Sequence, residues 1–146
     1  MHRPVITPRP DSPASQAVGF DLDGTLAVDQ GWQGGRIGLP QPGAIDALRA
    51  VAQQRAVFVF TARPLRWLPE IADWVTWYSG LDAFVDPAEG RAYWTARGTV
   101  LVTSTKLGAA CYVDDRAVHH AGDWGDTLAT VARVVGLDRA VGAVPA

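Results

Sequence analysis

The most informative segment of the chain reads Val18-Gly19-Phe20-Asp21-Leu22-Asp23-Gly24-Thr25-Leu26. A short apolar run ends here in two carboxylates two residues apart, and a Gly-Thr turn follows at once. This pattern predicts a buried strand over 17–21 that leads into a loop at its carboxyl end. Asp21, Asp23 and nearby backbone carbonyls could then face one centre, where two anions repel each other unless a cation or proton lies between them. An all-oxygen cluster of this kind suits Mg²⁺.

The composition of the chain predicts one globular domain with a substantial hydrophobic core. It has 146 residues, of which 48% are hydrophobic and 19% charged, values typical of a soluble protein. We assign this domain to residues 17–142, between a flexible, proline-rich N-terminal arm over 1–16 and a frayed C-terminus over 143–146. The net charge of -2 gives no bulk attraction to nucleic acid or to anionic lipid. A lone cysteine and the lack of a long apolar run favour the cytoplasm over a membrane or a secreted location.

Strand and helix patterns alternate along the rest of the chain. Residues 24–40 hold too many glycines for a helix and are predicted to form a mobile loop or a small hairpin. The alternation predicts an α/β protein, a three-layer α/β/α Rossmann-like sandwich with a mainly parallel sheet. Beyond the first strand, we expect strands at 56–60, 83–85, 99–103 and 110–113, and helices at 42–54, from about 64 to 78, and at 127–135.

Polar residues follow the predicted strands at the points where these strands end. In open parallel sheets, the carboxyl ends of the strands meet at one edge, and ligands bind there. We therefore expect one site to contain Asp21, Asp23, Thr61, Lys106, Asp114 and Asp115.

These residue types suit the transfer of a phosphoryl group. Asp21 is a candidate nucleophile that would form an aspartyl-phosphate, and Asp23 could protonate the leaving oxygen and then deprotonate the attacking water. Lys106 would neutralise charge on Asp21 and on the phosphoryl oxygens, while the hydroxyl of Thr61 would hold the phosphate. The pair Asp114-Asp115 would supply further oxygens to the metal.

The same motifs resemble those of the haloacid-dehalogenase (HAD) superfamily. Phe20-Asp-Leu-Asp-Gly-Thr25 is similar to its first motif, Thr61 to its second, Lys106 to its third, and Asp114-Asp115 to its fourth. The resemblance implies a HAD-like core and a Mg²⁺-dependent hydrolase. Because the phosphatases of the superfamily keep an acid two residues after the nucleophile, Asp23 implies a phosphatase rather than a dehalogenase.

Two details narrow this resemblance. Thr61-Ala-Arg63 and Asp114-Asp115-Arg116 resemble segments of the 3′-phosphatase domain of phage polynucleotide kinase, although small phage and bacterial members are closer still. By this analogy Arg63 would hold the substrate phosphate and Asp115, more than Asp114, would bind the metal. Thr25 and Arg116 are further candidates for substrate binding, although both arginines could instead pair with the acidic residues.

The spacing of the motifs leaves no room for the cap domain that the superfamily usually carries. The resemblance then implies an open cleft for a bulky phosphorylated substrate, such as a nucleic-acid end, or one completed by an oligomeric partner. The glycine-rich segment 31–38, with Trp32 and Arg36, would form a small flap over this cleft, and Trp32 would contact the substrate.

Two other classes of function remain open at this point. A signalling receiver also combines an acidic cluster, a threonine and a lysine around Mg²⁺, but it takes its phosphate on an aspartate at the end of a middle strand, where this chain has Thr61. A catalytically silent module that binds Mg²⁺ or phosphate could use the same fold. Substrate identity and oligomeric state are not fixed by the sequence.

Overall fold

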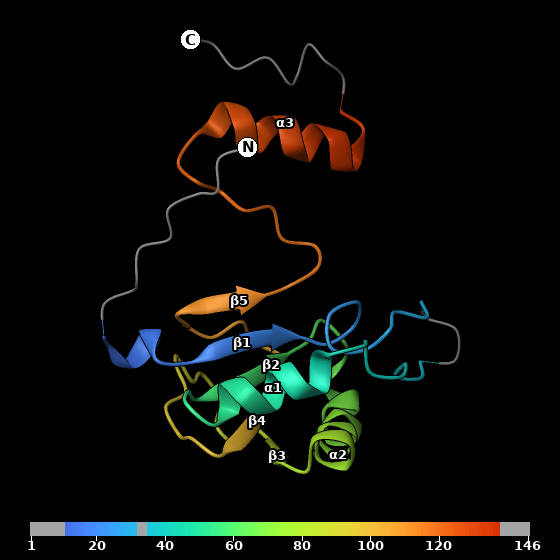
Figure 1. The fold of residues 1–146 in the computed structure, drawn as a ribbon, viewed down its shortest axis with the longest axis vertical. Helices are drawn as coiled ribbons and strands as arrows, with labels where there is room; N and C mark the ends of the chain where they lie inside the picture. The colour runs from blue at the N-terminus through green and yellow to red at the C-terminus, as the bar shows by residue number, and fades with distance from the viewer. Residues whose placement is uncertain (1–10, 32–34, 138–146) are drawn as a thin grey trace. The chain divides into compact units, whose positions relative to one another are not determined.

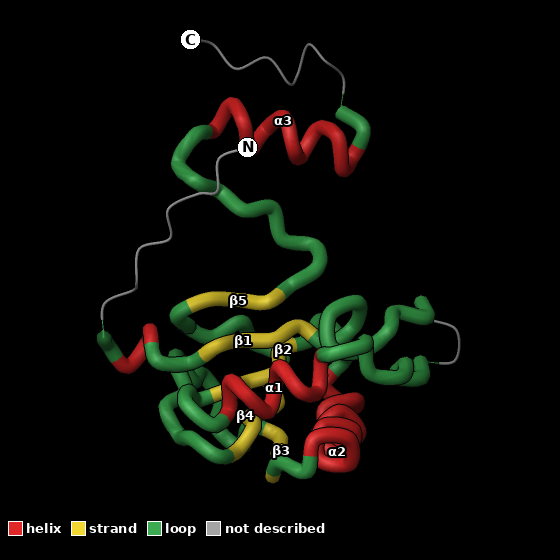
Figure 2. Tube along the Cα trace, viewed as in Figure 1, coloured by secondary structure: helices red, strands yellow, loops and turns green. Residues whose placement is uncertain are grey.

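The computed structural model describes residues 11–31 and 35–137, which contain a five-stranded sheet, three α-helices and two short 3₁₀ helices (Figures 1 and 2). The strands are β1 (Val18–Asp21), β2 (Val57–Phe60), β3 (Asp82–Val85), β4 (Thr99–Thr103) and β5 (Cys111–Val113). The helices are η1 (Pro13–Ser15), α1 (Ala44–Ala52), η2 (Leu65–Trp67), α2 (Leu68–Ser79) and α3 (Trp124–Val135). The fold is therefore the α/β, Rossmann-like fold that the sequence predicts.

The sheet is parallel throughout and has the order β3-β4-β2-β1-β5. From β1 the chain runs to β2 on one side, and from β4 it returns to β5 on the other side of β1. The junction of β1 and β5 is thus the point at which the direction of winding reverses, and ligands bind at the carboxyl ends of such strands. Phe20 pairs with Val113 at this junction, so the residues that follow both strands leave the sheet side by side.

Each face of the sheet carries its own apolar core. Helices α1 and α2 cover one face, and irregular segments after β3 and β4 cover the other. Burial on both faces explains why β2 is apolar at every position. The first core includes Phe20, Leu48, Val57, Val59, Ile71, Val75, Val100 and Val102, and the second includes Phe58, Phe60, Leu101 and Leu107.

The structure differs from the predicted second helix at its beginning. The turn η2 comes first and α2 begins only at Leu68, with Pro69 in its first turn, where a missing N–H costs nothing. Leu65, which falls within the predicted helix, is 68% exposed because it lies in the preceding turn. Helix α2 ends at Gly80, whose φ of 75° is the left-handed conformation that glycine adopts without strain.

The described residues form two compact units, one ending at Asp115 and the other beginning at Arg116. In the second unit, α3 starts three residues earlier than predicted because the carboxylate of Asp123 caps it, accepting hydrogen bonds from the N–H groups of Gly125 and Asp126. A single domain over 17–142 stays a prediction. Across the described part of the chain, no helix is both long and apolar enough to span a membrane.

Candidate active site

Three carboxylates meet where β1 and β5 end. Asp21 is the last residue of β1, and Asp114 and Asp115 directly follow β5. Each of the three offers an oxygen, and these oxygens lie within 4.8 Å of one another. Far-apart segments of the chain therefore converge here as predicted, and three carboxylates this close provide the donor set that a hard cation such as Mg²⁺ prefers.

Thr25 and Gly24 hold this carboxylate cluster (Asp21, Asp114 and Asp115) in place. The hydroxyl oxygen of Thr25 lies 3.4 Å from Oδ2 of Asp21 and 3.3 Å from Oδ1 of Asp115, and it accepts a hydrogen bond from the backbone N–H of Asp115. Gly24 has a φ of 83°, and a Cβ at this position would overlap the carboxylate of Asp115. Thr25, which we expected to bind substrate, thus serves to organise the cluster.

The electrostatics of the cluster also favour a cation. Burial and the negative charge of Asp114 raise the pKa of the Asp21 carboxyl from 3.8 to about 6, and Asp115 adds to this effect. Such a shift is the expected response of a carboxylate that loses water and faces like charges. A divalent cation among these oxygens would relieve the repulsion, so the residues present fit Mg²⁺.

The raised pKa predicts a stability effect in the metal-free protein. Asp21 binds its proton more tightly in the folded state (pKa about 6) than in the unfolded state (3.8). The protonated Asp21 carboxyl therefore contributes its full stabilisation below pH 3.8, and this stabilisation is lost as the pH rises through about 6. We expect Asp21→Asn to raise the free energy of unfolding near neutral pH by about 1 kcal/mol, after allowance for screening of a half-exposed group. This gain should vanish near pH 4.

Urea denaturation in the presence of a chelator measures this difference at both pH values. The exposed Asp73 on α2 provides a matched control, because Asp73→Asn removes the same charge away from the cluster. A stability difference for Asp21→Asn that does not change with pH would contradict the assigned electrostatics.

Asp23 does not join the carboxylate cluster, contrary to our expectation that it would help to bind the metal. Both of its carboxylate oxygens accept hydrogen bonds from Arg63, from Nε at 2.7 Å and from Nη2 at 2.8 Å. The strand ends at Asp21, and the chain then turns tightly, with the N–H groups of Thr25 and Ala27 both donating to the carbonyl of Leu22. Strand alternation therefore does not extend to Asp23, and its side chain is directed to a separate partner.

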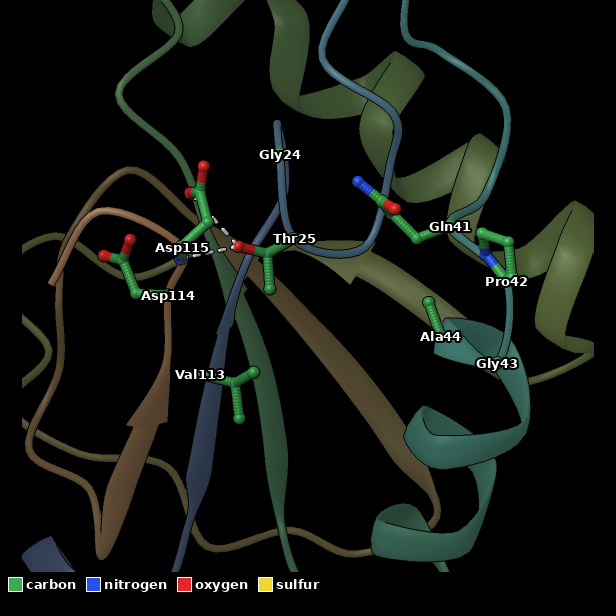
Figure 3. A pocket seen from close by; sticks show the side chains of 9 residues that line it. All are labelled: Gly24, Thr25, Gln41, Pro42, Gly43, Ala44, Val113, Asp114 and Asp115. Atoms are coloured by element: carbon green, nitrogen blue, oxygen red, sulfur yellow. Dashed lines mark hydrogen bonds between the residues drawn. The ribbon is translucent and has the colours of Figure 1, made fainter. Parts of the chain in front are cut away.

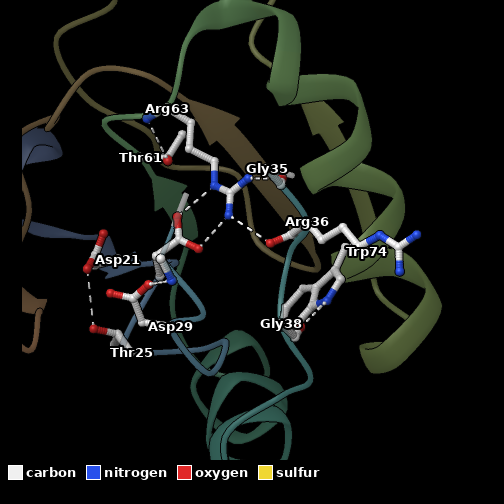
Figure 4. Close-up of polar contacts among 11 residues, drawn as sticks. Asp21, Thr25, Asp29, Gly35, Arg36, Gly38, Thr61, Arg63 and Trp74 are labelled. Atoms are coloured by element: carbon white, nitrogen blue, oxygen red, sulfur yellow. Dashed lines mark hydrogen bonds and ion pairs between the residues drawn. The ribbon is translucent and has the colours of Figure 1, made fainter. Parts of the chain in front are cut away.

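Arg63 is likewise placed differently from the expected phosphate ligand. Arg63 is only 6% exposed, and its guanidinium group also donates to the carbonyl oxygens of Gly35 at 2.5 Å and Arg36 at 3.2 Å (Figure 4). The structure thus shows the alternative in which Arg63 pairs with an acidic residue, Asp23.

The backbone of segment 35–38 is hydrogen-bonded to buried side chains of the core. In addition to the bonds from Arg63, Nε1 of Trp74 donates to the carbonyl of Gly38 at 3.1 Å (Figure 4). A Cβ on Gly38 would overlap the carbonyl of Val28, so this segment lies directly against the opposite side of the loop. The part of the predicted flap that the structure describes is thus bonded in place, and Trp32 lies outside the described residues.

Thr61 and Lys106 follow β2 and β4 as predicted, but their contacts are local. Thr61 is buried, and its hydroxyl accepts the backbone N–H of Arg63 at 3.0 Å. The ammonium group of Lys106 lies over the ring of Tyr112, 4.4 Å from its centroid, and among the described residues it forms no ion pair with Asp21. This contact of Lys106 with Tyr112 could not be predicted from the sequence, because Tyr112 is only one of the residues in a predicted apolar strand.

A cavity of about 510 Å³ borders the carboxylate cluster on the side of α1 (Figure 3). Asp114, Asp115 and Thr25 form one end of it, and Gln41 and the start of α1 form the other. None of its lining residues carries a positive charge. Arg116 begins the second unit, so its predicted contact with substrate stays a prediction.

Comparison with known proteins establishes the fold and no more. No family model and no curated protein matches the chain. Among solved structures, the chain is similar to a conserved protein coded by a locus from Bacteroides thetaiotaomicron, with 24% identity, a TM-score of 0.52, and coverage of 86% of this chain and 95% of that one. This likeness over nearly the whole length supports the α/β architecture.

Proposed function

We propose that this protein is a Mg²⁺-dependent phosphomonoester hydrolase that acts through an aspartyl-phosphate on Asp21. The observation that carries the proposal is the convergence of Asp21 with Asp114 and Asp115 at the switch point of a parallel sheet. This placement agrees with the resemblance of the four sequence motifs to those of HAD phosphatases. A structural role alone would not require three carboxylates within 4.8 Å, since such a cluster destabilises the protein unless it is neutralised.

In the proposed reaction, an oxygen of Asp21 attacks phosphorus and displaces the alcohol or phenol. Asp23 gives its proton to the departing oxygen, so that the neutral alcohol leaves. Water then attacks the phosphorus of the aspartyl-phosphate, gives its proton to Asp23 and releases inorganic phosphate and free Asp21. Mg²⁺, held by the carboxylate cluster, would supply positive charge for the phosphoryl oxygens.

Thr61 and Lys106 would complete the proposed binding of the phosphoryl group. Thr61 lies directly after β2, so its hydroxyl and neighbouring backbone N–H groups are candidates for hydrogen bonds to phosphate. Lys106 is exposed and has a long flexible side chain, which could turn from Tyr112 toward a bound phosphate. Because two of the nine residues that line the cavity are acidic and none is basic, a neutral group next to the phosphate fits this cavity better than a polyanion does.

Hydrolysis of p-nitrophenyl phosphate tests the proposed function directly. We expect turnover with Mg²⁺ and a loss of more than about a hundredfold after chelation, restored when Mg²⁺ is added back. A panel of nucleotides, sugar phosphates and 3′-phosphorylated oligonucleotides would then define the substrate. Metal-independent hydrolysis, or none with any of these substrates, would overturn the proposal.

A further inference from the structure

Arg63 binds both Asp23 and segment 35–36, which are far from it in the sequence. Asp23 precedes it by 40 residues and Gly35 by 28. The guanidinium group has five N–H donors in a fixed plane, and four of them bind Asp23 and the backbone of 35–36. Because Arg63 is buried and its guanidinium group is engaged in this way, it is poorly placed to bind a phosphate ion.

The two bonds to Asp23 fix the direction of its carboxylate. A bidentate pair of this kind holds both oxygens in the plane of the guanidinium group, which a lysine ammonium cannot do. A general acid must present its proton within hydrogen-bond distance of the leaving oxygen, so its orientation has a direct effect on the rate.

The other two bonds make the position of Arg63 depend on the segment 35–36. The guanidinium group also lies 4.9 Å from the ring centroid of Trp67, and the same ring fills the space where Gly35 would carry a Cβ. Gly35 has a φ of 67°, which other residues rarely adopt. Arg63, which binds Asp23, therefore packs together with segment 35–36 and Trp67.

We propose that Arg63 is a positioning residue for the general acid–base Asp23, and that the backbone of Gly35 and Arg36 holds Arg63 in the orientation required. This inference rests on the proposed function, because Asp23 acts as an acid only if the protein hydrolyses phosphate esters. It replaces the expected role of Arg63 as a ligand of the substrate phosphate, and the two roles predict different kinetics.

The dependence of the rate on the leaving group separates the two roles. A poor leaving group such as an alkoxide needs a proton from Asp23, whereas 2,4-dinitrophenolate leaves without one. We expect Arg63→Lys to lower kcat on an alkyl phosphate by about a hundredfold and on 2,4-dinitrophenyl phosphate by less than about fivefold, with KM changed by less than about threefold. Asp23→Asn should show the same selective loss.

A second variant tests the dependence on segment 35–36 without changing either charged group. Gly35→Ala should displace this segment from Trp67 and reproduce part of the same selective loss, and its effect should not add to that of Arg63→Lys. It also keeps the proposal testable if Arg63→Lys fails to fold. Arg66→Lys is the matched control, since Arg66 is exposed in the neighbouring turn η2, and it should behave as the wild type does.

The outcomes distinguish this inference from the proposed function. If the wild type hydrolyses both substrates but Arg63→Lys loses activity equally on both, with a higher KM and weaker inhibition by inorganic phosphate, Arg63 binds phosphate and the inference is wrong. Full activity of Arg63→Lys or Gly35→Ala on the alkyl phosphate would also overturn it. If the wild type hydrolyses neither substrate, the proposed function fails and the inference fails with it.

Discussion

Asp21→Asn is expected to lower the hydrolysis of p-nitrophenyl phosphate by on the order of 10⁴-fold while the fold is retained. The amide of asparagine does not act as a nucleophile toward phosphorus, so the covalent step is lost outright. The substitution preserves the shape of the side chain and removes one of three crowded negative charges. Loss of activity should therefore be accompanied by an unchanged circular dichroism spectrum.

Acid quenching during turnover gives a second measurement of the same step. In the wild type, phosphate from a labelled substrate should remain attached to the denatured protein as an acyl phosphate, and in Asp21→Asn it should not. Asp73→Asn, on the exposed side of α2, serves as the control and should keep both activity and labelling. More than a tenth of wild-type activity in Asp21→Asn would rule out Asp21 as the nucleophile.

The convergence of Asp21 with Asp114 and Asp115 could be predicted from the sequence because it depends on the backbone alone. Apolar runs identify β1 and β5, and a parallel sheet places their carboxyl ends at one edge. Pairing of Phe20 with Val113 then leaves little freedom for the carboxylates that follow. The distances between the carboxylate oxygens, in contrast, are known only from the structure.

The partners of Asp23, Arg63 and Lys106 could not be predicted in the same way. Their side chains reach beyond the strand ends, and their contacts depend on loops whose conformations are set by tertiary packing. Asp23 turns away because the chain folds back on the carbonyl of Leu22, and Arg63 is buried because segment 35–36 covers it. Loop contacts of this kind join residues far apart in the sequence, and no local periodicity reports them.

Asp115→Asn is expected to weaken the binding of Mg²⁺ by on the order of 10²-fold. A unit charge a few ångströms from a divalent cation contributes several kcal/mol at the effective dielectric constant of a protein surface, and partial exposure reduces this value. Asp115 is also the member of the cluster that Thr25 binds through both its carboxylate and its backbone N–H. Because its carboxylate is already held in place, its metal-binding geometry requires little reorganisation.

Isothermal titration of the chelator-treated protein with Mg²⁺ measures this affinity without reference to catalysis. Asp114→Asn should also weaken binding, and comparison of the two variants would show which aspartate contributes more. Asp73→Asn again provides the control and should bind Mg²⁺ as the wild type does. Unchanged affinity in both Asp114→Asn and Asp115→Asn would show that the carboxylate cluster is not the metal site.

Gly24→Ala tests the geometry of the cluster separately from its charge. The added Cβ would overlap the carboxylate of Asp115, and the φ of 83° at this position is strained for alanine. All three negative charges remain in this variant, so attraction of the cation as a whole is preserved. If Mg²⁺ requires the three oxygens in their present arrangement, Gly24→Ala should lower the affinity by about tenfold. If charge alone governs binding, the affinity should stay at the wild-type value, and the close approach of Gly24 to Asp115 would then have no part in holding the metal.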